Sequence, residues 1–341
     1  MSDETTGVGL VGYGTSGSVL HAPLIGAERR LRLRAVASRY PDRVHRDLPS
    51  MPVVPTADQM LEDPAVELVV IAAPNAVHYQ LARCALLAGR HVVVDKPFVV
   101  TSAEADELIG LASQRDRCLT VFHQRRWDSD FLTVQRCVRN GLLGRVSTYI
   151  ARYDRFRPDL GSQDQPSSGV LYDLGSHLID QALHLFGLPQ TILADVFAQR
   201  PGAVADDYFH LVLGYGQLRV ILHAGSLVRA PGPRFEVHGD EGSFVSLGID
   251  GQIAALLAGK RPGDPGWGIE DEDQHGTLTT EAGTGRLASV PGAYESFYRD
   301  MAAAIRGEGP VPVPATQGRD TIHMIECALL SSKDGRAVAV R

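Results

Sequence analysis

Hydrophobic and polar positions alternate along the first third of the chain as short apolar runs separated by amphipathic stretches. Apolar runs typical of strands buried on both faces are expected at residues 8–11, 33–37, 67–72, 91–94 and 119–122. Helices are expected between them at residues 56–61, 79–88 and 103–113. Strands that alternate with helices predict a parallel sheet covered on both faces, so residues 1–122 are expected to form an α/β domain.

The pattern changes after residue 122. Segments with period-two or continuous strand character are expected at residues 146–153, 191–198, 208–213, 218–223 and 235–238. They predict a mainly antiparallel sheet. Residues 263–285 are expected to form a long surface loop, and two helices are expected near residues 294–305 and 320–332. Because 341 residues exceed what one core usually supports, residues 123–341 are predicted to form a second domain.

The first apolar run ends at Gly12-Tyr13-Gly14-Thr15-Ser16-Gly17, which has the spacing G-x-G-x-x-G. In a βαβ unit the first glycine permits a turn, the second lets the backbone approach a pyrophosphate, and the third lets the helix pack against the strand. We therefore predict a dinucleotide-binding domain of the Rossmann type, with a purely structural glycine turn as the alternative in a chain that has 35 glycines. The residues expected to hold the pyrophosphate are Gly12, Gly14, Thr15, Ser16 and Gly17.

Ser38 and Arg39 follow the second predicted strand, where an acidic side chain would accept from the ribose 2′-hydroxyl of NAD. A hydroxyl followed by a guanidinium instead suits the dianionic 2′-phosphate of NADP. The alternative is a solvated arginine in a loop that also holds Arg43 and Arg46. The pattern favours NADP and leaves NAD possible.

Ligands bind at the carboxyl ends of parallel strands, so the residues that follow the next two predicted strands are further candidates for the cofactor site. Asn75 and His78, which follow Ala73-Pro74, are candidates for the nicotinamide end of the cofactor site. A turn former and a residue at a helix start explain them equally well. Lys96 ends the next strand and is expected to act at the same place, with a solvated lysine as the alternative.

A helix predicted to start near Asp173 carries polar side chains at i, i+4, i+7 and i+11, namely Asp173, His177, Asp180 and His184. At roughly 100° per residue they fall within about 60° of one another. Asp173 and His177 are the candidate acid–base pair, since a carboxylate that accepts from one imidazole nitrogen orients the ring. Asp180 and His184 also fit a solvated stripe. No metal is expected, because no third ligand of matching type lies near in sequence.

Composition narrows the setting of this chemistry. A net charge of −7 and a pI near 5.9 argue against a nucleic-acid surface, which needs a basic face. The four cysteines have no ligand-like spacing and are expected to be buried thiols. No apolar run approaches a membrane span, and the first residues are polar and acidic where a signal peptide needs a basic start and an apolar core. A cytoplasmic protein is expected.

Several longer motifs add to the glycine loop. They are Gly12-Tyr13-Gly14-Thr15-Ser16-Gly17-Ser18 with His21-Ala22-Pro23-Leu24, Lys96-Pro97, Arg125-Arg126-Trp127-Asp128, Leu171-Tyr172-Asp173-Leu174-Gly175-Ser176-His177, and Gly232-Pro233-Arg234 with His238-Gly239. On these motifs the chain resembles, almost end to end, the glucose-fructose oxidoreductase, inositol dehydrogenase and rhizopine-catabolism (Gfo/Idh/MocA) family, and within it the NADP-dependent scyllo-inositol dehydrogenases. It departs from the resemblance at Asp95, where members usually have glutamate before the Lys-Pro pair.

The resemblance implies a Rossmann domain followed by an α+β domain whose open sheet commonly makes subunit contacts, which suggests a homodimer or homotetramer. It also implies Lys96, Asp173 and His177 as the catalytic set for hydride transfer between a nicotinamide and a secondary alcohol of a cyclic polyol or sugar. Candidate substrate-binding residues are His123, Arg125, Trp127, Tyr153 and Arg157. The alternatives are a keto-sugar reductase of the same family and a cofactor-binding regulator without turnover, because one fold serves many functions.

Overall fold

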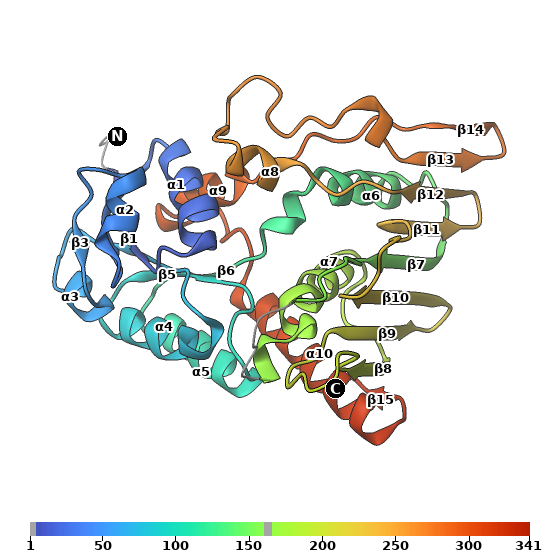
Figure 1. The fold of residues 1–341 in the computed structure, drawn as a ribbon, viewed down its shortest axis with the longest axis horizontal. Helices are drawn as coiled ribbons and strands as arrows, with labels where there is room; N and C mark the ends of the chain where they lie inside the picture. Colours follow the sequence, from blue (N-terminus) through green and yellow to red (C-terminus); the bar gives the residue numbers. More distant parts are fainter. Residues whose placement is uncertain (1–4, 160–165) are drawn as a thin grey trace. The chain divides into compact units, whose positions relative to one another are not determined.

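The computed structural model of the protein describes residues 5–159 and 166–341, so the acidic start of the chain lies outside the described residues (Figure 1). It divides into two compact units, each made of three segments. The first unit consists of Met1–Gln124, Gln252–Trp267 and Ala293–Arg319, and the second unit consists of Arg125–Gly251, Gly268–Gly292 and Asp320–Arg341. The predicted domains, 1–122 and 123–341, are each continuous in sequence, whereas the compact units are not.

The sheet of the first unit is six-stranded and parallel, in the order β3-β2-β1-β4-β5-β6. Its strands are β1 (Thr6–Val11), β2 (Leu31–Ala37), β3 (Val53–Val54), β4 (Leu68–Ile71), β5 (His91–Asp95) and β6 (Leu119–Phe122). The strand order reverses between β1 and β4, which is the place where nucleotides bind in doubly wound sheets. The predicted Rossmann domain is confirmed.

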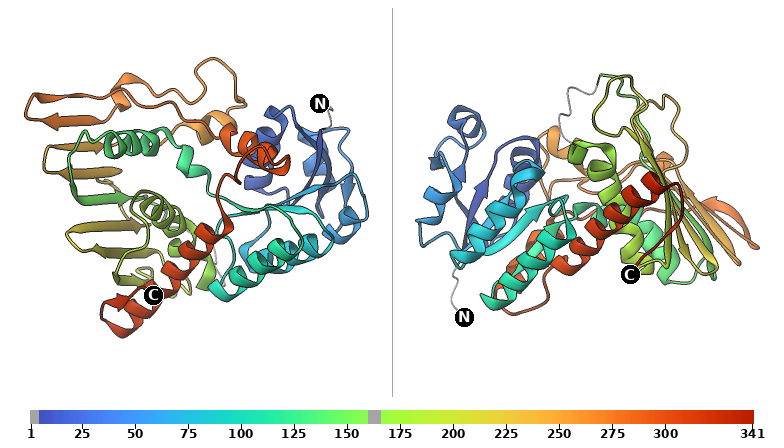
Figure 2. Two further views of the ribbon diagram at one scale, coloured as in Figure 1. Left: turned by 180° about the vertical axis from the view of Figure 1, so that it is seen from behind. Right: turned by 90° about the horizontal axis from the view of Figure 1, so that it is seen from below.

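Helices cover both faces of this sheet (Figures 1 and 2). Along the chain they are α1 (Ala22–Ala27), α2 (Pro41–Asp47), α3 (Ala57–Leu61), α4 (His78–Leu87), α5 (Ser102–Gln114), α8 (Gln252–Leu257) and α9 (Glu295–Ile305). On one face α4 packs on α5, and on the other α1 packs on α9. The middle of the sheet is fully apolar, since Val92, Val93 and Val94 of β5 are completely buried. Burial on both faces is why this strand reads as a continuous apolar run.

The second unit is built on a nine-stranded sheet, in the order β14-β13-β12-β11-β7-β10-β9-β8-β15. Its strands are β7 (Val146–Arg152), β8 (Thr191–Phe197), β9 (Tyr208–Tyr215), β10 (Leu218–Gly225), β11 (Phe235–Gly239), β12 (Gly242–Ser246), β13 (Thr277–Thr280), β14 (Gly283–Arg286) and β15 (Val338–Ala339). Neighbouring strands run antiparallel except β7 and β10, which are parallel. The prediction of a mainly antiparallel open sheet is confirmed.

The α-helices that the described residues of this unit form, wholly or mainly, are α6 (Ser129–Arg139), α7 (Ser176–Phe186) and α10 (Ala315–Asp334). They lie along one face of the sheet (Figure 2). The hydroxyls of Ser331 and Ser332 on α10 accept the backbone N–H groups of Ala194 and Val196 in β8. Along β9, buried residues alternate with partly exposed ones, so one face of the sheet is packed and the other is open.

One expectation was wrong, and one helix of the second unit was missed. Residues 263–285 were expected to be a surface loop, but they contain β13 and most of β14, which pair as a hairpin. All of β14 is exposed, so no buried face imposed a strand pattern on its sequence. α6 was not expected, although its buried residues Phe131, Val134 and Cys137 recur at helical spacing.

The four cysteines were all expected to be buried, and this is correct for two of them. Cys137 and Cys327 are buried, whereas Cys84 and Cys118 are partly exposed, and all four are free thiols. Within residues 5–159 and 166–341, no helix is both long and apolar enough to cross a membrane.

Candidate active site

The glycine loop leads from β1 into a π-helical turn, η1 (Ser16–His21), and then into α1. Gly12 has a φ of +93°, and a Cβ there would lie 2.4 Å from the carbonyl oxygen of Ala72. A Cβ on Gly17 would lie 2.3 Å from the carbonyl oxygen of Gly12. A Cβ on Gly14 would meet no atom of the described residues within 4 Å beyond its chain neighbours. The first glycine therefore makes the turn, the third packs, and the second leaves open space that fits an approaching pyrophosphate.

The helix that follows the loop differs from the expected regular α-helix in its first turn. Thr15 is exposed and Ser16 is partly exposed, so the backbone at the start of η1 is accessible. The hydroxyl of Ser16 donates to the carboxylate of Asp95 at 2.5 Å. The side chain of Ser16 is thus bonded inside the unit, which leaves its backbone N–H as the group of this residue that could hold an anion.

Ser38 and Arg39 lie just beyond the C-terminal end of β2. Arg39 is exposed, and Ser38 is partly exposed with its hydroxyl accepting the backbone N–H of Tyr40 at 3.1 Å. The guanidinium of Arg43 lies over the Tyr40 ring, 5.4 Å from its centre. An exposed cation and no carboxylate at residues 38–40 suit a phosphate at the end of β2.

His78 connects the ends of β4 and β5. Its Nε2 lies 2.8 Å from the carbonyl oxygen of Ala73, and its Nδ1 lies 2.9 Å from that of Pro97, which follows Lys96. His78 is buried, and its ring lies between these two carbonyl groups, which follow β4 and β5. Lys96 is partly exposed at the end of β5. After the end of β4, Pro74 is exposed, and Ala73 and Asn75 are partly exposed.

The start of α7 corrects the expected helix around Asp173. Residues Leu171–Gly175 form a π-helical turn, η5, and the α-helix begins only at Ser176. The spacing of 100° per residue therefore does not extend back to Asp173. Asp173 pairs with Arg155, whose Nη2 lies 3.2 Å from the carboxylate, and the Asp173 side chain is 44 % exposed. His177, the second residue of α7, is buried.

Asp180 and His184 do not form a solvated stripe. Asp180 is buried and pairs with the guanidinium of Arg126 through two contacts, at 2.6 and 2.9 Å. His184 is half-buried, and burial together with the charge of Arg126 lowers its pKa to about 4. Its Nε2 lies 3.3 Å from the guanidinium of Arg139, so the neutral ring accepts there. Within the described part of the chain, no group of three or more His, Cys, Asp or Glu side chains is arranged to hold a metal ion.

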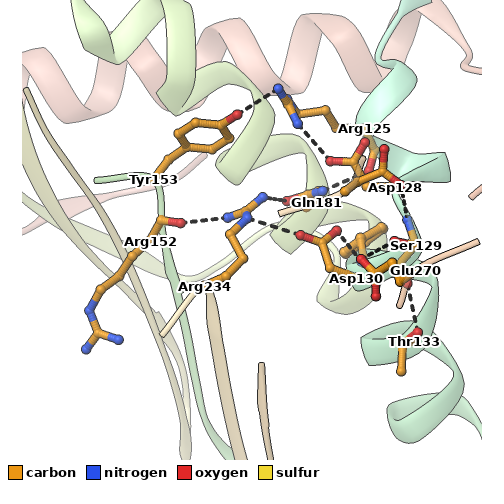
Figure 3. A network of polar contacts seen from close by, with 12 residues as sticks. Arg125, Asp128, Ser129, Asp130, Thr133, Arg152, Tyr153, Gln181, Arg234 and Glu270 are labelled. Atoms are coloured by element: carbon orange, nitrogen blue, oxygen red, sulfur yellow. Dashed lines mark hydrogen bonds and ion pairs between the residues drawn. The ribbon is translucent and has the colours of Figure 1, made fainter. Parts of the chain in front are cut away.

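Arg125 and Tyr153, two of the predicted substrate-binding residues, are brought together in the second unit (Figure 3). One nitrogen of the buried Arg125 guanidinium donates to the Tyr153 hydroxyl at 2.8 Å, and another donates to Asp128 at 2.9 Å. The guanidinium also lies 4.9 Å from the centre of the Tyr153 ring. Asp128 is completely buried, so its charge fixes Arg125, which in turn fixes the hydroxyl of Tyr153.

Arg234 meets the same ring and was not singled out as a site residue from the sequence. Its guanidinium lies 5.1 Å from the centre of the Tyr153 ring, and it donates to the carbonyl of Arg152 at 2.9 Å and to the side chain of Gln181 at 3.3 Å. Gln181, on α7, also donates to the carbonyl of Arg125 at 2.8 Å. Figure 3 shows these residues as one polar network, in which Gln181 of α7 and Arg152 of β7 meet Arg234, the residue before β11.

Asp130 is a further buried acid of this network, besides Asp128. Its Oδ2 lies 3.4 Å from Nε of Arg234, and the side chain is almost completely buried. Burial raises the pKa of Asp130 to about 8; the charge of Arg234 opposes this shift and the nearby carboxylates Asp128 and Asp250 add to it. The raised pKa favours the protonated form of Asp130 near neutral pH.

The remaining candidates are spread over both units. His123 is buried in the first unit, Trp127 is partly exposed at the end of a 3₁₀ turn in the second unit, and Arg157 is exposed with its N–H bonded to the carbonyl of Ser226. Lys96 belongs to the first unit with the glycine loop, whereas Asp173 and His177 belong to the second. The catalytic roles of these three residues stay predictions.

A Rossmann unit with an open glycine loop, followed by a unit built on an open sheet, defines the class of two-domain, nucleotide-binding oxidoreductases. Residues 6–123 match the family model described as "Oxidoreductase family, NAD-binding Rossmann fold", and residues 135–340 match "Oxidoreductase family, C-terminal alpha/beta domain". The chain belongs to this oxidoreductase family, Gfo/Idh/MocA, as its motifs indicated.

Several relatives match over nearly the whole chain. The scyllo-inositol 2-dehydrogenase (NADP(+)) IolW of Bacillus subtilis is 41% identical, with 98% of this chain and 96% of the relative covered. The uncharacterized oxidoreductase YdgJ of Escherichia coli is 43% identical, with 98% of both chains covered. The solved structure of the putative oxidoreductase yvaA from Bacillus subtilis superposes with a TM-score of 0.97 at 41% identity and covers 100% of both chains.

Proposed function

We propose that this protein is an NADP-dependent dehydrogenase that oxidises a secondary alcohol of a cyclic polyol or sugar, with an inositol as the first candidate. The observation that carries the proposal is the 41% identity, over 98% of this chain, to a scyllo-inositol 2-dehydrogenase that uses NADP(+). The exposed Arg39 and the partly exposed Ser38 at the end of β2 support the choice of NADP, because a 2′-phosphate needs a nearby cation. The bound nicotinamide would accept the hydride.

In this proposal the chain's own residues handle the proton and the developing charge. His177 accepts the hydroxyl proton, and Lys96 stabilises the developing alkoxide as a nearby cation. Asp173 orients and tunes the imidazole, and its pairing with Arg155 moderates the negative charge that it presents. The roles assigned to Lys96, Asp173 and His177 follow the resemblance; Lys96 and Asp173 are partly exposed, whereas His177 is buried.

The substrate-binding residues in the proposal are those predicted from the sequence, and Tyr153 is the best supported of them. The Tyr153 hydroxyl accepts a hydrogen bond from Arg125, and the ring lies near two guanidiniums, so the position of this hydroxyl is fixed. Fixed donors and acceptors suit a polyol, which presents several hydroxyls in a rigid ring. The other residues proposed to line the substrate site are His123, Arg125, Trp127 and Arg157.

A keto-sugar reductase that uses the same residues in the opposite direction is the second candidate. A more distant relative, the D-apiose dehydrogenase of Paraburkholderia graminis, is 26% identical over 91% of this chain and is named for a sugar, which supports sugars as candidate substrates but not the direction of the reaction. A cofactor-binding regulator without turnover is the third. Measured turnover of any polyol or sugar excludes the regulator.

The open sheet face supports the proposed homodimer or homotetramer. Leu193 and Phe197 of β8 are 47% and 44% exposed on the face opposite the buried Ile192 and Ala194. Exposed apolar side chains on a sheet mark an interaction surface, and a second copy of the chain is the proposed partner. Light scattering of the protein and of a Leu193→Glu variant tests this. The expected cytoplasmic location stays a prediction that cell fractionation would test.

The decisive experiment is a screen of inositols and aldoses with NADP and NAD, in both directions. We expect oxidation of at least one inositol, faster with NADP. In that assay Lys96→Ala and His177→Ala should each lower kcat by orders of magnitude while nearly preserving the affinity for NADP. Retained activity in either variant would remove that residue from the mechanism, and a screen without turnover would refute the dehydrogenase.

A further inference from the structure

Asp95 ends β5 and directly precedes Lys96, at the position where the motif comparison showed a departure from the usual glutamate. Each of its two carboxylate oxygens accepts a hydrogen bond. Oδ2 accepts the hydroxyl of Ser16 at 2.5 Å, and Oδ1 accepts the backbone N–H of Lys96 at 2.8 Å. One buried side chain therefore bonds to the start of the phosphate-binding turn and to the candidate catalytic lysine.

Two further buried residues, His21 and Tyr298, form a chain of polar contacts that reaches Asp95. Nε2 of His21, in η1, lies 3.6 Å from Oδ2 of Asp95, and Nδ1 of His21 lies 2.6 Å from the hydroxyl of Tyr298 on α9. Both His21 and Tyr298 are completely buried. Because a carboxylate only accepts, the ring is best satisfied when the tyrosine hydroxyl donates to Nδ1 and the proton on Nε2 faces Asp95. The Tyr298 hydroxyl on α9 therefore selects the His21 tautomer whose Nε2 proton faces Asp95.

Asp95 is ionised although it is buried. Burial by itself would raise the pKa of this carboxyl group, but the His21 ring, the Ser16 hydroxyl and the Lys96 ammonium together outweigh it and lower the pKa to about 2. The carboxylate is therefore a strong acceptor for both of its hydrogen bonds at neutral pH.

We propose that Asp95 is a positioning residue that holds the phosphate-binding turn and Lys96 at a fixed spacing. The proposal rests on the proposed function, in which the turn binds the cofactor and Lys96 acts on the alcohol. Oδ2 holds the turn through Ser16, and Oδ1 holds the backbone of Lys96, so displacement of either one is resisted by the other. Because Ser16 gives its hydroxyl to Asp95, it serves the cofactor through its backbone N–H.

The double contact of Asp95 with Ser16 and with the backbone of Lys96 is called the Asp95 tie below. It depends on the length of the Asp95 side chain. The Ser16 hydroxyl already approaches Oδ2 at 2.5 Å, and Asp95 is almost completely buried, so an added methylene would have to displace the turn or the end of β5. The aspartate thus matches the position of η1 in this chain.

A double-mutant cycle tests the tie directly. Ser16→Ala removes the hydroxyl, Asp95→Asn keeps the side chain's size but removes its charge, and the third protein carries both changes. NADPH affinity, measured by fluorescence titration without any substrate, should weaken in each single variant by roughly three- to tenfold, and the double variant should be no weaker than the worse single one. In turnover, kcat should fall in both single variants, and further in Asp95→Asn, because only Asp95 contacts the backbone of Lys96 directly.

The matched control is Ser18→Ala, in the same turn. The Ser18 hydroxyl donates to the carbonyl of Gly14 at 2.9 Å and does not touch Asp95. Its effect on NADPH affinity should therefore add to that of Asp95→Asn. Additive effects of Ser16→Ala and Asp95→Asn would overturn the proposal, as would unchanged affinity and kcat in Asp95→Asn.

Two further outcomes are also decisive. If Asp95→Asn does not fold, the comparison of Ser16→Ala with Ser18→Ala decides, because the tie predicts weaker NADPH binding in the Ser16 variant and equal affinities would refute it. If no polyol or sugar is turned over, the proposed function has failed, and the NADPH cycle still confirms or refutes the tie.

Discussion

Arg126 and Asp180 form a two-pronged ion pair, with Nε 2.9 Å from Oδ2 and Nη2 2.6 Å from Oδ1. Both side chains are almost completely buried. Asp180 lies three residues after His177 on α7, so the pair fixes the helix that carries the proposed base to the segment that begins at Arg125.

Replacing Asp180 by Asn should strongly destabilise the second unit. The amide keeps the shape of the carboxylate but leaves the buried guanidinium of Arg126 without its counter-charge, which costs about 3–5 kcal/mol. Thermal and denaturant unfolding measure the loss. Asp106→Asn is the control, because Asp106 pairs with Arg319 on the surface, where a pair contributes at most about 1 kcal/mol. Equal losses in the two variants would contradict the assignment.

This pair also shows what could be predicted from the sequence. Five of the six strands in the sheet of the first unit were expected, because most of their residues are buried, and β6 was expected at its observed bounds. The short strand β3, whose two residues are partly exposed, was not expected. The position of Asp180 on a polar face of a helix could be predicted as well. Its partner could not, because Arg126 lies 54 residues earlier and only the folded chain brings the two together.

Two kinds of site feature could not be predicted from periodicity. The π-helical turns η1 and η5 depend on local packing, and a Cβ on Gly175 would lie 2.9 Å from the Leu171 side chain. The contacts of Arg234 and Asp130 also depend on tertiary structure, since Arg234 lies on a connection before β11 and Asp130 lies in the unexpected helix α6. Single buried charges leave no repeating pattern in a sequence.

Arg39 should determine the choice between the two nicotinamide dinucleotides. If its exposed guanidinium binds the 2′-phosphate, Arg39→Ala should lose roughly ten- to a hundredfold in NADP affinity and little in NAD affinity. Titration of both cofactors measures the ratio. Arg43→Ala is the matched control, because that guanidinium lies over the Tyr40 ring. Equal affinities for NADP and NAD in the unmutated protein would refute the NADP preference.

Asp130 should make stability fall as the pH rises. Its pKa is raised from 3.8 in the unfolded chain to about 8 in the folded protein, so between these values the folded protein holds a proton that the unfolded chain has lost. The stabilisation is complete below about pH 4 and is lost as the pH rises through about 8, with a slope of at most about 1.4 kcal/mol per pH unit.

Asp130→Asn cannot ionise and should remove this slope. The window from about pH 6 to about pH 8 is the most informative, because the pKa of Asp206, raised by burial to about 6, adds a slope of the same sign only below it. Unfolding midpoints of the two proteins across that window measure the difference. Parallel curves would show that Asp130 is ionised in the folded protein, held so by Arg234.

The pH dependence of catalysis should reveal how Asp173 acts on His177. Only a neutral imidazole accepts the alcohol proton, so oxidation should rise with pH. Asp173 favours the imidazolium, and Arg155, whose guanidinium lies 3.2 Å from the Asp173 carboxylate, offsets that charge. Asp173→Asn should therefore move the midpoint of the rise to lower pH, and Arg155→Gln should move it to higher pH, each by roughly one unit or less because the site is partly solvated.

Because the two variants should shift the midpoint in opposite directions, comparing them separates an electrostatic effect on His177 from general damage. General damage to the second unit would lower kcat in both variants without moving their midpoints apart. The measurement is the pH profile of alcohol oxidation at saturating NADP for the unmutated protein and the two variants. A common midpoint in all three would mean that Asp173 does not act electrostatically on the base, and its role in orienting His177 would then have to be abandoned in favour of an ion pair with Arg155 that supports the turn before α7.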